Sequence, residues 1–475
     1  MSRIPFKHQG TGRDFLKKRK GAILADEMGL GKTYQTIMAL GQISQVTNVI
    51  VCPASLKTNW EREIHQEYPE DVVCVAGTND EDFPDAAWLV VNYDRLSKWK
   101  EIILASPFSL VGDEAHYIKG KSKRTDDFLE LAKAAERVYL LTGTPIMNRP
   151  MELFNLLKAI GHPLGKGKTA FAERYCAGAM KALVFDKSNG RRMYMPIERS
   201  WTFRENPGRY RVQPIMEAKG ASNLEELQRE ISGVFLRRKK TDVLDLPEKL
   251  IQTIPVELSP EWQKRYDSAF DDYIDFLREN PVTGKDVDAV LLARHIVELQ
   301  KLKQVCSQGK LERIKEDVDE LLEAEEKVVL FTQYQKTLED LRGMWKGAVS
   351  LAGEDTMKVR DKAIDSFQNG KAPVFVGNIK AAGVGITLTA ASNVLFADLD
   401  WTPAIHDQAM DRCHRIGQAG TVNVRYYVAA GTVEEDILEM HAAKRATAEA
   451  VLEGGEAAAD QGVMDLIGRL STHSR

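Results

Sequence analysis

The sequence has few cysteines, and they follow no pattern. Five cysteines are scattered over 475 residues and never form a Cys-x-x-Cys pair. An odd, scattered set argues against a disulfide framework and against a structural zinc site. We therefore expect an intracellular, reducing environment: the cytoplasm of a microbe or of a virus-infected cell, or the nucleus if the source is eukaryotic.

Two further absences narrow the class of protein. No stretch approaches the roughly 18 to 20 apolar residues that a membrane-spanning helix needs, and the first residues lack an apolar signal core. We therefore expect no membrane partner. The net charge is -4, so the chain lacks an overall basic field, and a nucleic-acid partner would have to meet a local basic cleft.

Length and hydrophobic pattern indicate two α/β lobes. A chain of 475 residues is too long for one compact core. Short apolar runs alternate with helix-compatible segments in two regions, which is typical of parallel sheets covered by helices on both faces. The expected strands are 22–25, 48–52, 72–75, 88–91, 109–112 and 138–141, and then 252–258, 328–332, 348–351, 374–377, 394–398 and 422–427. A final helix is expected at 433–452, before a small-residue and polar tail.

The boundary between the lobes is expected near residue 245. The first lobe would comprise 1–245 and carry an insertion at about 165–240, in which residues 165–221 show no clear period. The second lobe would comprise 246–475 and carry a helical insertion at about 260–310.

The stretch Asp26-Glu27-Met28-Gly29-Leu30-Gly31-Lys32-Thr33 has the layout of a phosphate-binding loop, because a short apolar run precedes it and a helix-compatible segment follows it. Glycines let backbone N–H groups close around phosphate oxygens, and the helix N-terminus adds partial positive charge. Lys32 would reach the β- and γ-phosphates, and the Thr33 hydroxyl would ligate Mg²⁺. Asp26 departs from the general pattern, which has glycine there. An ordinary glycine turn is the alternative, so residues downstream must decide.

An acidic pair follows the apolar run 108–112, in the tetrapeptide Asp113-Glu114-Ala115-His116 (a DEAH box). The carboxyl end of a buried parallel strand opens onto the ligand crevice of such sheets. Asp113 could hold the Mg²⁺ shared with Thr33, and Glu114 could orient the attacking water or accept its proton. The alternative is a pair of surface carboxylates at a strand end.

A second basic motif lies in the other half of the chain, in the segment Gln408–Gln418. Arg412 and Arg415 are three residues apart, so on a helix they would share a face. Two guanidinium groups directed across a cleft could stabilise the charge on a transferring phosphoryl group. The alternative is a solvated helix face.

Taken in order, these motifs resemble the SWI/SNF-type ATPases of helicase superfamily two, as a minimal two-lobe core. The segments that carry the resemblance are Asp26–Thr33, Val51–Trp60, Asp113–His116, Leu141–Pro145, Phe235–Val243, Val329–Tyr334, Asn378–Ser392, Gln408–Gln418 and Gly431–Glu435. The similarity extends from about residue 5 to residue 450 and is nearest to the distant subgroup that contains the annealing helicases. It implies two tandem RecA-like lobes, with parallel sheets flanked by helices and helical insertions. Asp26 matches the family's own form of the loop.

The resemblance implies an ATP site to which both lobes contribute. Its catalytic residues would be Lys32, Asp113, Glu114, Arg412 and Arg415. Its ATP-binding residues would be Gln9, which would read adenine, then Asp26, Glu27, Met28, Gly29, Leu30, Gly31, Lys32 and Thr33, and also Gly385 and Gln408. The Mg²⁺ ligands would be Thr33 and Asp113.

The family tracks duplex DNA through backbone contacts, and the residues that would make them are Ser55, Lys57, Asn59, Lys380 and Thr387. We therefore expect an ATP- and Mg²⁺-dependent motor that translocates on double-stranded or forked DNA, remodels or reanneals it, or displaces bound protein. We expect a monomer, with replication, repair or recombination proteins as candidate partners. A strand-separating DNA or RNA helicase is the alternative, and a catalytically idle scaffold is a third hypothesis.

Overall fold

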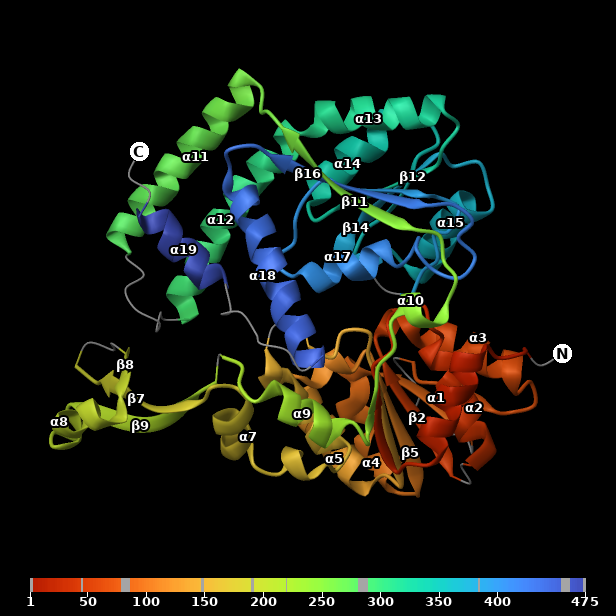
Figure 1. Ribbon diagram of the computed structural model, residues 1–475, viewed down its shortest axis with the longest axis vertical. Coiled ribbons are helices and arrows are strands. Elements are labelled where there is room, and N and C mark those ends of the chain that lie inside the picture. Colours follow the sequence, from red (N-terminus) through yellow and green to blue (C-terminus); the bar gives the residue numbers. More distant parts are fainter. Residues whose placement is uncertain are drawn as a thin grey trace.

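The structure is a computed structural model with two α/β lobes, drawn one above the other in Figure 1. It describes residues 3–43, 46–77, 86–146, 149–188, 192–218, 220–280, 289–382, 385–453 and 462–472. In these ranges no helix is both long enough and apolar enough to cross a membrane.

The first lobe is built on a seven-stranded parallel sheet in the order β10-β1-β6-β5-β2-β4-β3. Its strands are β1 (Gly21–Leu24), β2 (Thr47–Cys52), β3 (Val73–Val75), β4 (Trp88–Asn92), β5 (Phe108–Asp113), β6 (Arg137–Leu141) and β10 (Phe235–Leu236). Its helices are α1 (Lys7–Lys17), α2 (Lys32–Ile43), α3 (Lys57–Glu67), α4 (Leu96–Leu104), α5 (Lys123–Ala134), α6 (Leu153–Ala159), α7 (Lys168–Tyr175) and α9 (Leu224–Ile231). The strand β5 is buried along its whole length, because side chains on both faces of the sheet pack under helices. The strands expected in this region are confirmed.

An antiparallel sheet, not a helical unit, fills much of the insertion in the first lobe. Its strands are β7 (Ala179–Asp186), β8 (Arg192–Pro196) and β9 (Tyr210–Glu217), in the order β8-β7-β9, with the short helix α8 (Trp201–Arg204) between the last two. This unit, which we call the arm, projects from the body at the lower left of Figure 1. The sequence shows no clear period over residues 165–221, so this antiparallel sheet was not predicted.

The later part of the expected insertion returns to the first sheet. Phe235 and Leu236 pair in parallel with Ile23 and Leu24 of β1, so β10 is an edge strand of the lobe's own sheet. The chain then passes through α10 (Lys240–Val243) to the second sheet, which it enters at Lys249. We call residues 237–248 the connector.

The second lobe has a six-stranded parallel sheet in the order β11-β16-β15-β12-β14-β13. Its strands are β11 (Lys249–Val256), β12 (Val328–Thr332), β13 (Val349–Leu351), β14 (Val374–Asn378), β15 (Asn393–Phe396) and β16 (Val422–Ala429). Its helices are α11 (Pro260–Glu279), α12 (Ala289–Gly309), α13 (Leu311–Glu323), α14 (Gln335–Met344), α15 (Met357–Gln368), α16 (Ile379–Ala382), α17 (Pro403–Met410), α18 (Val433–Glu453) and α19 (Val463–Thr472). The expected helical insertion is present as α11 and α12, whereas α19 forms where a polar tail was expected.

A buried ion pair ties this insertion to the sheet. The Lys310 ammonium, between α12 and α13, donates to both Glu434 carboxylate oxygens at 2.8 and 2.6 Å and to the Tyr427 carbonyl at 2.8 Å. The helix α18 then extends from the second lobe to α9 of the first, where Gln228 donates to the Leu452 carbonyl. The two lobes therefore meet through α18 as well as through the connector.

Candidate active site

The predicted phosphate loop lies between β1 and α2, at the carboxyl edge of the first sheet. Gly29 and Gly31 have φ values of 83° and 74°, a conformation that favours glycine. The Lys32 ammonium donates to the carbonyls of Asp26 at 2.7 Å and Glu27 at 3.2 Å, so it lies within the curve of the loop. Burial lowers the pKa of Lys32, against the opposing effect of Glu114, Asp26 and Asp113. Strand, loop and helix thus have the arrangement that the sequence predicts.

The helix α1 packs against this loop and brings Gln9 to it. A Cβ atom added to Gly31 would lie 2.4 Å from the Gln9 side-chain nitrogen, so the end of this glutamine lies directly against the loop. The Gln9 side-chain oxygen accepts from the Phe6 N–H at 3.0 Å, and a His8 ring nitrogen lies 3.2 Å from the Leu30 carbonyl. These contacts hold Gln9 beside the loop; its reading of adenine stays a prediction.

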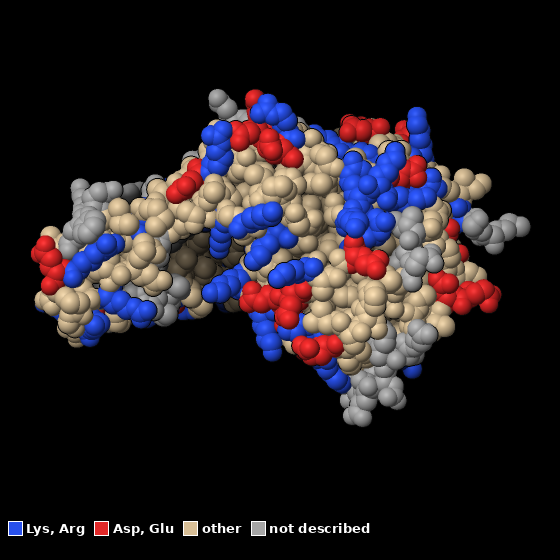
Figure 2. Space-filling view, turned by 90° about the horizontal axis from the view of Figure 1, so that it is seen from below, with Lys and Arg blue, Asp and Glu red and all other residues tan. Residues whose placement is uncertain are grey.

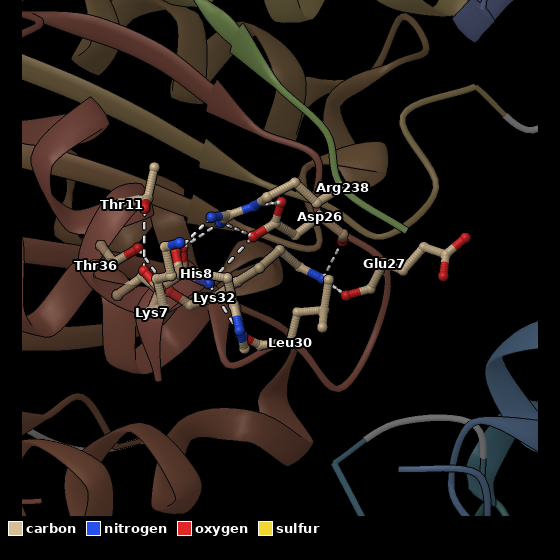
Figure 3. A network of polar contacts seen from close by, with 10 residues as sticks. Lys7, His8, Thr11, Asp26, Glu27, Leu30, Lys32, Thr36 and Arg238 are labelled. Atoms are coloured by element: carbon tan, nitrogen blue, oxygen red, sulfur yellow. Dashed lines mark hydrogen bonds and ion pairs between the residues drawn. The ribbon is translucent and has the colours of Figure 1, made fainter. Parts of the chain in front are cut away.

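Asp26 is held by the connector, as Figure 3 shows. Arg238 donates through Nε to one oxygen of the fully buried Asp26 carboxylate at 2.9 Å and through a terminal nitrogen to the other. The same guanidinium also bonds Gln35 and the His8 carbonyl. The carboxylate therefore braces the loop against β10 and the connector. The motif Phe235–Val243 contains this arginine, but nothing in its sequence singles out Arg238 for the role.

The acidic pair ends β5, as predicted. Asp113 accepts from the Trp60 indole N–H at 2.8 Å and from the Glu114 N–H at 2.9 Å. Burial, reinforced by the neighbouring Glu114, raises the pKa of Asp113 to about 6. Glu114 has φ 49°, a strained conformation for a residue other than glycine, and its carboxylate lies 3.2 Å from His116. Burial would raise the pKa of Glu114, but His116, Lys32 and Arg412 outweigh it and the pKa is lowered.

The donor set suits Mg²⁺ bound together with phosphate rather than alone. No group of three or more His, Cys, Asp or Glu in the described ranges could chelate a metal by itself. Mg²⁺ is commonly held by one or two protein oxygens plus substrate phosphates and water. Asp113, a buried carboxylate with a raised pKa, and the half-buried Thr33 at the start of α2 fit that pattern. Their role as ligands stays a prediction.

The second lobe presents Arg412 and Arg415 from a turn, not from a helix. The helix α17 ends at Met410, whose carbonyl accepts the N–H groups of both Cys413 and His414. The prediction that the two arginines share a helix face is therefore wrong. Burial, with a contribution from Arg415, lowers the pKa of Arg412 to about 10, and the Glu114 carboxylate opposes this shift. Arg412 therefore lies within electrostatic reach of the first lobe's acid pair.

Arg415 lies against the phosphate loop. A Cβ atom added to Gly29 would be 3.4 Å from the Arg415 Cβ atom. The Arg415 guanidinium itself donates to the Ile386 carbonyl at 3.2 Å and the Thr387 hydroxyl at 3.0 Å. The structure thus brings both predicted halves of the site together and links Arg415 to a predicted DNA contact.

Lys240 joins the two halves. Its backbone N–H donates to the Glu27 carboxylate at 2.8 Å, while its buried ammonium bonds the Asp411 carboxylate at 2.6 Å and the His414 carbonyl at 2.7 Å. A cleft of about 730 Å³ opens beside it, lined among others by Met28, by the motif residues Gly143–Pro145 and by the buried Gln408. Gln408 thus lies at the lobe interface, next to the loop.

The predicted nucleic-acid residues divide into two groups. Ser55 and Thr387 belong to segments at the lobe interface: a Cβ atom on Gly385, two residues before Thr387, would lie 2.7 Å from Leu56 and 3.6 Å from the Ser55 carbonyl. Gly385, predicted to bind ATP, therefore packs against Ser55 and Leu56 of the first lobe, and its contact with nucleotide stays a prediction.

The other three have protein partners. The Lys57 ammonium donates to the Ala76 carbonyl at 2.6 Å, Asn59 accepts from Arg62, and Lys380 pairs with Asp400 at 3.1 Å. Each would have to exchange or share a partner to bind a phosphate.

Comparisons with known proteins agree with this architecture. The model of the SNF2-related domain matches residues 12–311, and the model of the helicase conserved C-terminal domain matches residues 310–417. The chain belongs to the SNF2-related family. The resemblance to SWI/SNF-type proteins is thereby confirmed.

Relatives in the SNF2-related family include a SWI/SNF-related matrix-associated actin-dependent regulator of chromatin subfamily A-like protein 1 homolog of Caenorhabditis elegans, 31% identical over 92% of this chain and 60% of that protein. The DNA annealing helicase and endonuclease ZRANB3 of Bos taurus is 30% identical over 91% of this chain and 39% of its own length. The chain therefore spans less than two thirds of these relatives. A solved Sulfolobus solfataricus SWI2/SNF2 ATPase core in complex with double-stranded DNA is 25% identical, with 99% of this chain and 97% of that chain covered and a TM-score of 0.43.

Proposed function

We propose that this SNF2-related chain is a DNA-dependent ATPase that translocates on double-stranded DNA, and that it remodels or reanneals DNA or displaces bound protein. The observation that carries the proposal is the position of Arg415 against Gly29 of the phosphate loop, together with the electrostatic interaction between Arg412 and Glu114. A site divided between two lobes is complete only when they close, which couples hydrolysis to movement.

Each residue has a distinct part in this mechanism. The loop and Lys32 bind the phosphates of ATP, Glu114 orients the attacking water, and Arg412 stabilises charge that develops on the transferring group. Asp113 and Thr33 would hold Mg²⁺, whose chemistry is to neutralise phosphate charge. The Arg415–Thr387 bond connects this site to the predicted DNA track, so a movement of Thr387 on DNA binding would shift Arg415.

Double-stranded DNA as the track is supported by the family and by the packing of Gly385, two residues before Thr387, against Ser55 and Leu56 where the lobes join. Backbone contacts at this junction would make binding tolerant of sequence and sensitive to salt. The relatives' names include an annealing helicase, which favours reannealing among the outcomes that we propose.

The test is an ATPase titration with single-stranded, duplex and forked DNA and with RNA, at two salt concentrations. We expect strong stimulation by duplex or forked DNA and loss of turnover in Lys32→Ala and Glu114→Gln. Glu136→Gln, an exposed site on the same lobe, is the matched control and should turn over normally. Stimulation by single-stranded RNA without stimulation by duplex DNA would contradict the proposal.

Translocation without strand separation needs a second measurement. The motor should displace the third strand of a triplex while leaving a simple duplex overhang paired. Efficient separation of the duplex would instead favour the strand-separating helicase.

A further inference from the structure

A groove in the first lobe is lined by several lysines that have no part in the site described above. It has a volume of about 500 Å³ and lies between the loop after the DEAH box, α5, α6 and the turn before α7. The charged residues that line it are Lys119, Lys121, Lys158, Lys166, Lys168 and Asp126. Five positive charges against one negative charge make this a basic groove in a chain whose net charge is -4.

Four of these lysines are not engaged by the protein. Within the described part of the chain, Lys121, Lys158, Lys166 and Lys168 are exposed and make no ion pair. Lys119 differs, because it lies 3.5 Å from the Glu152 carboxylate. Many surface lysines of the chain do pair, as Lys301 does with Glu298 at 2.7 Å. Like charges gathered without partners repel one another, so a bound anion would stabilise the group.

The walls of the groove are held in place. Asn155 of α6 donates to three successive carbonyls of the loop, those of Ile118, Lys119 and Gly120, at 3.0, 3.1 and 3.3 Å. A Cβ atom added to Gly165 would lie 2.4 Å from the Lys158 backbone, so the turn packs directly on α6. The lysines therefore project from backbone whose arrangement is fixed before any ligand arrives.

We propose that this groove binds the phosphate backbone of a second nucleic-acid segment, away from the track predicted at Ser55 and Thr387. Lysine side chains act as flexible point charges, which suits a repeating row of phosphates better than a single planar group. A row of charges also fits an extended polymer better than one phosphorylated side chain, which a planar arginine fork would hold.

The neighbouring arm extends this basic surface. Residues 179–217 contain eight Lys or Arg and four Asp or Glu, a surplus of four positive charges. Figure 2 shows a hollow between the arm and the body of the molecule, with Lys and Arg side chains on the arm and along the body beside the hollow. A DNA duplex that leaves the motor could lie along this hollow, between the arm and the body of the molecule.

The proposal rests on the proposed function, because it takes the bound polymer to be the DNA on which the motor acts. A branched substrate would then occupy the track and the groove together, whereas a short linear duplex would occupy one of them. The groove therefore predicts tighter binding of forks than of linear DNA.

The test compares Lys121→Ala/Lys158→Ala/Lys166→Ala/Lys168→Ala with a matched variant of the second lobe, Lys346→Ala/Lys358→Ala/Lys362→Ala/Lys371→Ala. All eight lysines are exposed, and none makes an ion pair within the described ranges, so neither variant should lose its fold. Binding of a labelled fork and of a short linear duplex is measured by fluorescence anisotropy at several salt concentrations, and ATPase activity at saturating linear duplex is measured in parallel.

We expect the groove variant to bind the fork at least about tenfold more weakly, with a salt slope smaller by up to about 3.6, since each phosphate contact contributes about 0.9. Its ATPase rate at saturating linear duplex should match that of the unchanged protein, as should all properties of the second-lobe variant.

Unchanged fork affinity and salt slope in the groove variant would overturn the inference and leave the proposed function standing. Binding of a phosphorylated peptide in the groove, without binding of a second DNA segment, would overturn the nucleic-acid assignment. An unchanged protein that neither binds DNA nor is stimulated by it would overturn both.

Discussion

The two halves of the candidate site are held in different ways. In the first lobe, side chains from distant segments fix the key carboxylates: Arg238 holds Asp26, and Trp60 holds Asp113. In the second lobe, the turn that carries the arginines is fixed by nearby backbone, because Gln418 donates to the carbonyls of Ala391 and Cys413 at 2.8 and 3.2 Å. The phosphate-loop half thus depends on long-range packing, whereas the arginine half is a compact unit that would move with its lobe.

Lys240 is the point at which the two halves touch through the connector. It is bonded to Glu27 on one side and to Asp411 and His414 on the other. Opening the lobes must either break these bonds or carry the connector along. Substitutions in the turn that carries Arg412 and Arg415 should therefore affect turnover. Substitutions that loosen the phosphate loop should affect both turnover and stability.

The largest effect is expected from Arg412→Ala, which removes a guanidinium that interacts electrostatically with Glu114. Removing an arginine that stabilises a transferring phosphoryl group typically costs on the order of 10³-fold or more in kcat. The KM for ATP should change little, because the phosphate loop is untouched. Steady-state kinetics at saturating DNA measure both, with the exposed Arg342→Ala on α14 as the control. A loss of less than about tenfold would contradict the role.

A large effect on stability is expected from Arg238→Met, on the loop side. The change leaves the buried Asp26 carboxylate without its ion pair, and breaking such a pair costs about 3 to 5 kcal/mol. Urea unfolding followed by fluorescence measures the loss. Arg265→Met removes an exposed pair with Glu261 and should cost at most about 1 kcal/mol. Equal losses in the two variants would show that the Asp26–Arg238 pair does not brace the loop.

A smaller effect is expected from Trp60→Phe, which keeps a buried aromatic ring but removes the bond to Asp113. A hydrogen bond to a charged group contributes about 1.5 to 3 kcal/mol, and about 1.4 kcal/mol corresponds to tenfold in rate. We expect kcat to fall about 10- to 100-fold, with a higher Mg²⁺ concentration needed for half-maximal activity.

The same lobe offers a matched control for this change. The fully buried Trp88 donates its indole N–H to Asp71 at 2.7 Å, away from the site. Trp88→Phe should therefore lower the free energy of unfolding about as much as Trp60→Phe does, and it should leave the Mg²⁺ dependence unchanged. Equal Mg²⁺ dependence in both variants would mean that Trp60 only fills space.

Local patterns in the sequence predicted what local structure determines. Each expected strand forms, because runs of apolar residues between turn residues have one stable place in a covered parallel sheet. The loop at 26–33 and the acid pair were equally visible, since both lie directly after such strands. Asn378, at the start of the motif Asn378–Ser392, also has a local role: its side chain accepts the Lys380 N–H at 3.1 Å and so caps α16.

Tertiary contacts determined what the sequence could not show. Spacing alone placed Arg412 and Arg415 on one helix face, but the Met410 carbonyl ends α17 before them. Trp60 ends the motif Val51–Trp60, but its bond to Asp113 spans 53 positions and no local pattern indicates it. The partner of Asp26 lies 212 positions away, and Lys57, expected on DNA, reaches the Ala76 carbonyl. No periodicity encodes such pairings, because the packing of the sheet sets them.

The smallest effect is expected on the pH dependence of stability. It comes from a buried charge in the interior of the second lobe, outside the candidate site. Lys303 of α12 is fully buried, with its ammonium 4.3 Å from the centre of the Trp401 ring. Burial lowers the pKa of Lys303 to about 8, against the opposing effect of Asp400 and Asp398.

Below pH 8 both the folded and the unfolded chain carry this proton, so the cost of burying the charge is constant. Between about pH 8 and the ordinary lysine pKa the unfolded chain holds the proton more tightly, so the free energy of unfolding should rise with pH by up to about 1.4 kcal/mol per pH unit. Urea unfolding of the unchanged protein and of Lys303→Met from pH 7 to 10 measures this. The free energy of unfolding of the unchanged protein minus that of Lys303→Met should increase above pH 8. Lys301→Met, exposed on the same helix, should show no such growth. If this difference in free energy of unfolding stays constant from pH 7 to 10, the interior of the second lobe stabilises the charged Lys303 ammonium as well as water does.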